Sequence, residues 1–241
     1  MNKTLRIIPL RLTPHTDRTS ILQAYSREAG AVSFAVPAGS GPAAARRRAL
    51  LQPLTPLEVE ASIRPGRDIH TFREPRALMA LHGILTDPAR RAVAMFLAEA
   101  LQTILRQSEA DPLTFDYIIG AIGLLNDAQT PVANFHLTFL TGLATVLGIA
   151  PDPTDYRPGM LFDMLDGRFR QSAALHGHTL SSADSAAAAR LLRINWENMG
   201  RYRMTGAERA AVLDRILEYY TLHYANLTAM KSPAVLHSLL N

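Results

Sequence analysis

The sequence predicts an α+β protein in which a small β-barrel is followed by an all-helical region. Up to Pro75, apolar and polar residues alternate and turn-forming residues recur at short intervals, as in strands joined by tight turns. Beyond Pro75, long runs rich in alanine and leucine have helical spacing. Because these helices follow the strands instead of alternating with them, a parallel α/β sheet is not expected. We therefore expect a barrel domain over residues 1–78 and a helical domain over residues 79–241.

Five strands are expected before Pro75. Four of them cover residues 5–13, 19–27, 31–36 and 67–74, and the fourth in chain order lies within residues 50–61. Turn-forming residues separate them, such as Glu28 to Gly30 after the second strand and Pro65-Gly66 before the fifth. Residues 38–48, AGSGPAAARRR, are interpreted as a mobile loop before the fourth strand. Five short strands in this length match the OB-fold, a small closed barrel that binds oligonucleotides.

Five helices are expected in the second part. They cover residues 88–107, 112–127, 132–147, 182–195 and 207–224. Asp87 is a good cap for the first of them and Pro88 suits its first turn. Gly148 is a common stop residue after the third. Residues 150–180 are rich in Pro, Gly, Asp and His, so we interpret them as an inserted loop with a hairpin around residues 162–169.

Positive charge is concentrated in the first third of the chain. Twelve Lys or Arg residues stand against six Asp or Glu residues at positions 1–80, a net charge of +6, so the remainder carries −2 of the chain's +4. Nearly all of these cations are arginine, which binds a phosphate through two parallel hydrogen bonds. A polyanionic partner is therefore expected for the barrel.

The composition also excludes several classes of protein. The chain has no cysteine, which excludes disulfides, thiolate zinc sites and cysteine nucleophiles. Its longest apolar stretch, residues 92–105, is interrupted by Glu99 and Gln102 and is unsuited to crossing a bilayer. The amino terminus lacks the unbroken apolar core of a signal peptide. We expect a cytoplasmic protein.

Arginines in or beside predicted loops of the barrel are the candidate DNA contacts. A charge run is usually a solvated loop, but the barrel and its charge favour phosphate contact here. The loops of the first hairpin and of the last turn border the usual binding face of an OB-fold. The candidates are Arg46, Arg47 and Arg48 in the predicted mobile loop, Arg18 in the first hairpin loop, and Arg64 and Arg67 beside the last turn.

Aromatic side chains of the barrel are candidates for stacking on bases, as in many single-strand binders. They are Tyr25, Phe34 and Phe72. Phe34 lies on an apolar strand face and is expected in the core. Phe72 shares its strand face with His70 and Glu74, a more exposed pattern, so Phe72 is the candidate that we retain.

Histidines in the helical part have alternative interpretations. His176 and His178, with Asp163 and Asp166 nearby in sequence, have the nitrogen and oxygen atoms that a metal site uses. A polar loop is the commoner interpretation, because neither a thiol nor helical spacing fixes the geometry. His136 lies on an apolar helix and is interpreted as a core residue.

Several strings, in this order, resemble the RecO family. SREAGAVSFAVPAG is similar to the family's second and third strands and LLQPLTPLEVE to its fourth. RRAVAMFLAEALQTILR resembles its long first core helix, ANFHLTFLTGLATVLGIAPD a later helix, and KSPAVLHSLL the closing segment. The resemblance covers almost the whole chain, and its specificity comes from the order of these matches, since no single string is a chemical signature.

The resemblance implies a non-enzymatic, nucleoid-associated repair mediator. Such a protein would bind single- and double-stranded DNA, anneal complementary strands and help load recombinase together with RecR and the single-strand binding protein. The acidic tail of that binding protein would contact the helical domain. Cations available there are Arg90, Arg91, Arg193, Arg201 and Arg203, although ion pairs with helix neighbours explain them equally well.

One departure from the family concerns metal. Many relatives carry a four-cysteine zinc site in the region that here reads DMLDGRFRQSAALHGHTL, and this chain has no cysteine there. We therefore expect no zinc or other cofactor, and we expect packing alone to hold this region. Two alternative functions remain: a protein scaffold with incidental DNA contact, which would show little DNA affinity, and a metal-dependent hydrolase, which metal content would reveal.

Overall fold

The computed structural model describes residues 2–64 and 66–239 and divides the chain into two compact units. Unit 1 is Met1–Thr130 and unit 2 is Pro131–Asn241. Secondary structure changes from strands to helices near residue 78, but unit 1 also holds the first helices after the barrel. Pro65 of the predicted Pro65-Gly66 turn lies outside the described residues, whereas Gly66 has the positive φ of 72° that such a turn requires.

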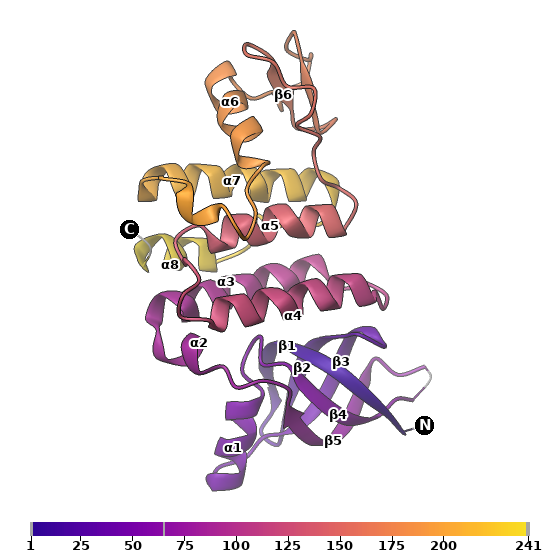
Figure 1. Ribbon diagram of the computed structural model, residues 1–241. Helices are drawn as coiled ribbons and strands as arrows, with labels where there is room; N and C mark the ends of the chain where they lie inside the picture. The colour runs from indigo at the N-terminus through magenta and orange to yellow at the C-terminus, as the bar shows by residue number, and fades with distance from the viewer. Residues whose placement is uncertain (1, 65, 240–241) are drawn as a thin grey trace. The chain divides into compact units, whose positions relative to one another are not determined.

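The predicted five-stranded barrel is confirmed (Figure 1). Its strands are β1 (Asn2–Thr16), β2 (Thr19–Ser26), β3 (Gly30–Pro37), β4 (Leu57–Ser62) and β5 (Ile69–Ala77). They close in the order β1-β2-β3-β5-β4, and β3 with β5 is the one parallel pairing among the described strands of the barrel. Alternate residues such as Leu5, Leu22 and Val59 fill the interior. The α+β class predicted from the change of period is thus correct.

The predicted mobile loop at residues 38–48 is wrong, because most of it forms helix α1 (Pro42–Leu50). Pro42 occupies the first helical turn, where its missing N–H costs nothing, and the three alanines that follow favour a helix. Only Ala38 to Gly41 remain as a connection. Ala44 of α1 and Leu51 after it are buried, and Leu51 packs in the barrel core.

Helix α3 (Pro88–Ile104) packs against β1, and the middle of that strand is buried on both faces. Ile7 points into the barrel and Ile8 faces outward, yet both side chains are fully buried. Across the neighbouring strand, the amide of Gln102 in α3 donates to Gln23 Oε1 at 2.7 Å. The outer face of β1 around Ile8 is therefore covered by helix and is unavailable to a ligand.

The turn between β2 and β3 touches the backbone that follows α3. Gly30 has a φ of 69°, and a Cβ atom there would lie 2.4 Å from Ser108 O. Ala31 N donates to that same carbonyl at 2.9 Å. The buried Tyr25 hydroxyl lies 3.2 Å from both Glu109 O and Asp111 N. Only glycine fits this approach, because both the backbone conformation and the available space exclude a side chain.

Unit 1 continues with α2 (His82–Thr86), α3 and α4 (Pro112–Asn126). The predicted cap is confirmed, since the Asp87 carboxylate accepts from Ala89 N and Arg90 N. Arg90 itself is buried and donates to the carbonyls of Leu125, Ala128 and Thr130 at 2.8–3.0 Å. Arg90 is therefore wrong as a cation for a partner, because its guanidinium satisfies carbonyls at and just beyond the end of α4.

Unit 2 contains six regular elements and one short 3₁₀ turn among the described residues. They are α5 (Phe135–Val146), β6 (Leu161–Asp163), β7 (Arg168–Arg170), α6 (Ser182–Leu191), the 3₁₀ turn η1 (Met199–Arg201), α7 (Gly206–His223) and α8 (Ser232–Leu239). The predicted hairpin is confirmed as β6–β7, whereas α6 ends four residues earlier than predicted and α8 was not predicted as a helix. His136 is a buried core residue as predicted, and burial lowers its pKa to about 3. No described helix combines the length and apolarity that a membrane span needs.

Replacing Gly30 with alanine should destabilise the protein far more than the same change at Gly66. Both glycines have a positive φ near 70°, so the backbone strain of about 1 kcal/mol is shared. Only Gly30 faces backbone, and we expect a loss of about 3 kcal/mol there in urea unfolding. Equal losses in the two variants would show that the contact with Ser108 contributes nothing.

Candidate nucleic-acid interface

Four of the predicted arginines gather at the β1–β2 end of the barrel. Arg18 is exposed in the tight turn between β1 and β2, where Thr16 pairs with Thr19. Its carbonyl accepts a hydrogen bond from Ala38 N at 2.8 Å, which holds the turn against the chain leaving β3. The segment that leads into α1 therefore starts beside Arg18.

The three arginines of α1 lie next to this same segment. Arg47 Nη2 donates to Pro37 O at 3.0 Å, and Arg48 Nη1 donates to Gly39 O at 2.8 Å. Arg46 is exposed. Because a guanidinium has five N–H donors, each of these bonds leaves donors for a phosphate. We call this group of Arg18, Arg46, Arg47 and Arg48 the α1 arginine cluster.

Arg64 and Arg67 form a separate pair in the β4–β5 connection. Both are exposed, and Arg67 N donates to Arg64 O at 3.4 Å. The pairing of Asn2 with Ser62 places this connection beside the start of β1, whereas the α1 arginine cluster lies at the other end of that 15-residue strand. The predicted candidates therefore form two groups, which we call the α1 arginine cluster and the β4–β5 arginine pair.

The barrel's aromatic rings contribute little exposed surface. Tyr25 is wrong as a stacking candidate, because its ring is 1% exposed and its hydroxyl is held against residues 109–111. Phe34 is buried as predicted. Phe72 is half-buried, and its ring meets Phe34 edge-on with 5.2 Å between ring centroids. Stacking by Phe72 stays a prediction that depends on the exposed part of its ring.

The region expected to lack zinc is held by ion pairs as well as by packing. Asp163 is 1% exposed and its carboxylate lies 3.0 Å from Arg170 Nε and 3.3 Å from His176 Nε2. It also accepts from the N–H groups of Leu165 and Asp166. The expectation of packing alone is therefore wrong, because a buried carboxylate is neutralised by Arg170.

His178 donates its backbone N–H to His176 Nδ1 at 3.3 Å, but its ring pairs with a different carboxylate. Its Nδ1 lies 3.3 Å from Glu218 Oε1, and Arg215 also binds Glu218. In the described part of the chain, no three His, Cys, Asp or Glu side chains are grouped so that they could hold a metal ion. The metal-dependent hydrolase thus gains no support from the geometry.

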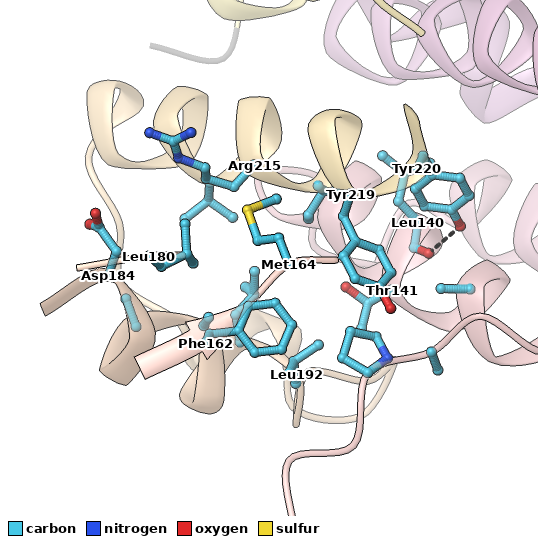
Figure 2. A pocket seen from close by; sticks show the side chains of 18 of the residues that line it. Leu140, Thr141, Phe162, Met164, Leu180, Asp184, Leu192, Arg215, Tyr219 and Tyr220 are labelled. Carbon is cyan, nitrogen blue, oxygen red and sulfur yellow. Dashed lines mark hydrogen bonds between the residues drawn. The ribbon is translucent and has the colours of Figure 1, made fainter. Parts of the chain in front are cut away.

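Unit 2 also contains an apolar cavity that the sequence did not predict (Figure 2). Its volume is about 240 Å³, and four side chains point into it: Phe162 of β6, Met164 just after β6, Leu192 just after α6 and Tyr219 of α7. Burial raises the pKa of Tyr219 to about 12, and its hydroxyl donates to Ile149 O at 2.8 Å. A protonated phenol in an apolar wall fits a bound hydrophobic side chain better than a chemical reaction.

Two family models together match nearly the whole chain. The model for the N-terminal part of recombination protein O matches residues 1–79, and the model for its C-terminal part matches residues 85–233. Among curated proteins, the DNA repair protein RecO of Porphyromonas gingivalis is 38% identical over 240 residues, which cover 97% of each chain. The proteins of that name from Azobacteroides pseudotrichonymphae and Phocaeicola vulgatus are 34% and 33% identical and are covered over 93% and 99% of each chain.

The purified protein should contain no stoichiometric metal. Asp163 is already neutralised by Arg170. His176 contacts the carboxylate of Asp163, whereas His178 contacts that of Glu218. Elemental analysis after dialysis should therefore give far less than one zinc per chain. A near-equimolar metal that survives dialysis and disappears in the H176A/H178A variant would contradict this prediction.

Asp163→Asn should destabilise unit 2 by about 2 kcal/mol, because the buried side chain loses the charge that binds Arg170 and His176. Asp166→Asn is the matched control, since Asp166 also pairs with Arg170 but is about half exposed. Its effect should be below 1 kcal/mol. Thermal and urea unfolding measure both. Similar, small effects would show that the buried ion pair does not hold the hairpin.

Proposed function

We propose that this chain, which belongs to the RecO family of DNA repair proteins, binds single- and double-stranded DNA through the barrel and anneals complementary strands without enzymatic turnover. The observation that carries the proposal is the α1 arginine cluster. Arg18, Arg47 and Arg48 each share a hydrogen bond with one short backbone segment, Pro37 to Gly39, and Arg46 is the exposed neighbour of Arg47.

The cluster suits a phosphate backbone better than a single small anion. Its arginines stand on a tight turn and on a helix, so their backbone is fixed before a ligand binds. Each guanidinium that replaces a counterion at a phosphate adds affinity that falls as salt rises. Contacts of this kind position a strand without reading its bases. The bases of a bound strand would therefore stay free to pair with a complementary strand.

The partners that we propose come from the family. RecR and the single-strand binding protein would act with this chain when recombinase is loaded. This chain would act at the nucleoid. The acidic tail of the single-strand binding protein is proposed to contact the helical part of the chain, residues 79–241. Of the arginines expected to be available there, Arg90 is buried, and Arg91, Arg193, Arg201 and Arg203 are exposed.

The variant R46A/R47A/R48A should bind every unstructured oligonucleotide more weakly, to a similar extent for each base composition. Each lost contact to a single strand reduces the log–log salt slope by about 0.7, so three lost contacts reduce it by about 2. Fluorescence anisotropy at several salt concentrations measures both quantities. Stability should fall by no more than about 1 kcal/mol, because the lost bonds from Arg47 and Arg48 to Pro37 O and Gly39 O are exposed and alanine favours the helix.

The variant R46K/R47K/R48K is the matched control for charge. It keeps the three cations but loses the forked geometry, so the salt slope should stay while affinity falls by less than in the alanine variant. R64A/R67A tests the β4–β5 arginine pair in the same way. Unchanged affinity and slope in a folded R46A/R47A/R48A protein would exclude α1 as a DNA contact. Little affinity in the unaltered protein would favour a protein scaffold.

A further inference from the structure

β2 and β3 form an uncharged outer wall of the barrel, with the start of β5 beside them (Figure 1). Neither β2 nor β3 contains a charged residue. Leu22 and Phe34 point into the barrel core, so their neighbours along each strand point outward. Strand pairing sets these outward side chains side by side. We call this group the β3 outer patch, and its members are Ile21 of β2, Ser33 and Ala35 of β3, and Ile69 of β5.

The β3 outer patch is accessible to a ligand. Ile69 is 42% exposed, and the other three side chains are half-buried. Ile21 lies opposite Ala35, and Ser33 lies opposite Ile69, so three aliphatic side chains and one hydroxyl form the surface. Helix α3 borders the patch at Gln23, which pairs with Ser33 and accepts the hydrogen bond from α3. The patch is thus a small aliphatic surface beside the covered part of the barrel.

Both arginine groups of the barrel border this patch. Pro37, the last residue of β3, accepts a hydrogen bond from Arg47 of the α1 arginine cluster at 3.0 Å. On the other side, Arg64 N of the β4–β5 arginine pair donates to His70 Nδ1 at 3.4 Å, one residue beyond Ile69. From residue 33 to residue 37, β3 advances by about 13 Å. β3 therefore provides a short path between two groups that lie at opposite ends of β1.

The neighbouring wall, formed by β4 and the rest of β5, is less suited to a phosphate backbone. Glu58 and Glu60 of β4 point outward there, because the residues between them along the strand fill the core. Each lies opposite an arginine of β5, Arg76 or Arg73. The two carboxylates repel phosphates and compete with them for these arginines. The uncharged wall at β3 has no such competitor.

We propose that the β3 outer patch contacts the deoxyribose groups of a single strand whose phosphates are bound by the two arginine groups, so that the barrel binds DNA strands in preference to RNA strands. This inference rests on the proposed function, because it concerns the strand that the barrel binds. Each sugar in a strand lies between two phosphates. A surface between two phosphate-binding groups therefore meets the sugars of the strand.

Sugars fit this patch better than bases do. Bases stack mainly on aromatic rings, and the barrel's Tyr25 and Phe34 are buried. Aliphatic side chains suit the C–H groups of a deoxyribose. A ribose places its 2′-hydroxyl against the same surface, where the hydroxyl loses water without gaining an equivalent partner. The bases point away from the barrel and stay free to pair, as annealing requires.

The test compares two oligonucleotides that differ only in the 2′-hydroxyl, oligo-dU and oligo-rU of about 15 nucleotides, a length within the range of one OB-fold site. Fluorescence anisotropy with the full chain at one salt concentration gives both affinities. Because both strands carry the same phosphates, contacts from the arginines contribute about equally to each. We expect oligo-dU to bind about fivefold more tightly, the effect of one poorly solvated hydroxyl.

The test variant is Ile69→Ser, which places a hydroxyl where the patch is most exposed. Its preference for oligo-dU should fall below about twofold, because a 2′-hydroxyl gains a partner there. Leu78→Ser is the matched control, since Leu78 follows β5 outside the patch and is 45% exposed. This control should keep the full preference. R46A/R47A/R48A should weaken the binding of both strands and leave their ratio unchanged.

Two outcomes would overturn the inference while leaving DNA binding by the barrel intact. The first is that the unaltered chain binds oligo-rU as tightly as oligo-dU, or more tightly. The second is that a folded Ile69→Ser protein, checked by thermal unfolding, keeps the full preference for oligo-dU, which would place the discrimination outside the patch. If the unaltered chain bound neither strand, the proposed function itself would fail.

Discussion

The pairing of β3 with β2 positions the α1 arginine cluster, and the pairing of β3 with β5 closes the barrel. Among the described residues this parallel pairing joins only Ser33 to Ile69 and Phe34 to His70. Beyond Phe34, β3 stays paired with β2 alone and follows it to the β1–β2 turn. The chain therefore leaves the sheet beside Arg18, enters α1 and returns to the barrel core at Leu51. The register of β2 and β3 thus places the β1–β2 turn beside the segment that leads into α1.

Two arginines of that cluster have a structural role as well as a proposed binding role. Arg47 and Arg48 satisfy carbonyls at the end of β3 and just beyond it, and they lie in the last turn of α1, where cations complement the helix dipole. Their charge is therefore stabilised before any strand arrives. Within the described part of the chain, the Arg46 guanidinium makes no hydrogen bond or ion pair with another residue. The three consecutive arginines of α1 therefore differ in their contacts, although they form one run in the sequence.

Much of the fold follows from local patterns, because alternation, helix caps and turn residues act over a few neighbours. The five strands, the cap at Asp87 and the hairpin near residues 162–169 are of this kind. The prediction of a mobile loop at AGSGPAAARRR was wrong, because its glycines end before Pro42 and the alanines after Pro42 favour a helix. Burial of Tyr25 and Arg90 depends on residues 35 to 86 positions away, which no local pattern reveals.

The same limit applies to the candidate site. The charge count and the predicted turns identified the arginines, because both can be obtained from the sequence without the fold. It could not show that Arg18 lies beside α1 while Arg64 and Arg67 lie beside the other end of β1, because strand register decides this. The arginines at 193, 201 and 203 were noted singly. Their gathering depends on Asn198 and Tyr202, whose hydrogen bonds close a compact turn.

The ion pair between Asp163 and Arg170 has a consequence for how this protein meets oxidative damage. Thiolates that ligate a metal are open to oxidation, which releases the metal and unfolds the site. A carboxylate and a guanidinium have no such chemistry, and the chain has no cysteine anywhere. The link between the buried carboxylate and Arg170 in the β6–β7 hairpin is therefore one that oxidants do not break. It persists under the same oxidants that damage DNA.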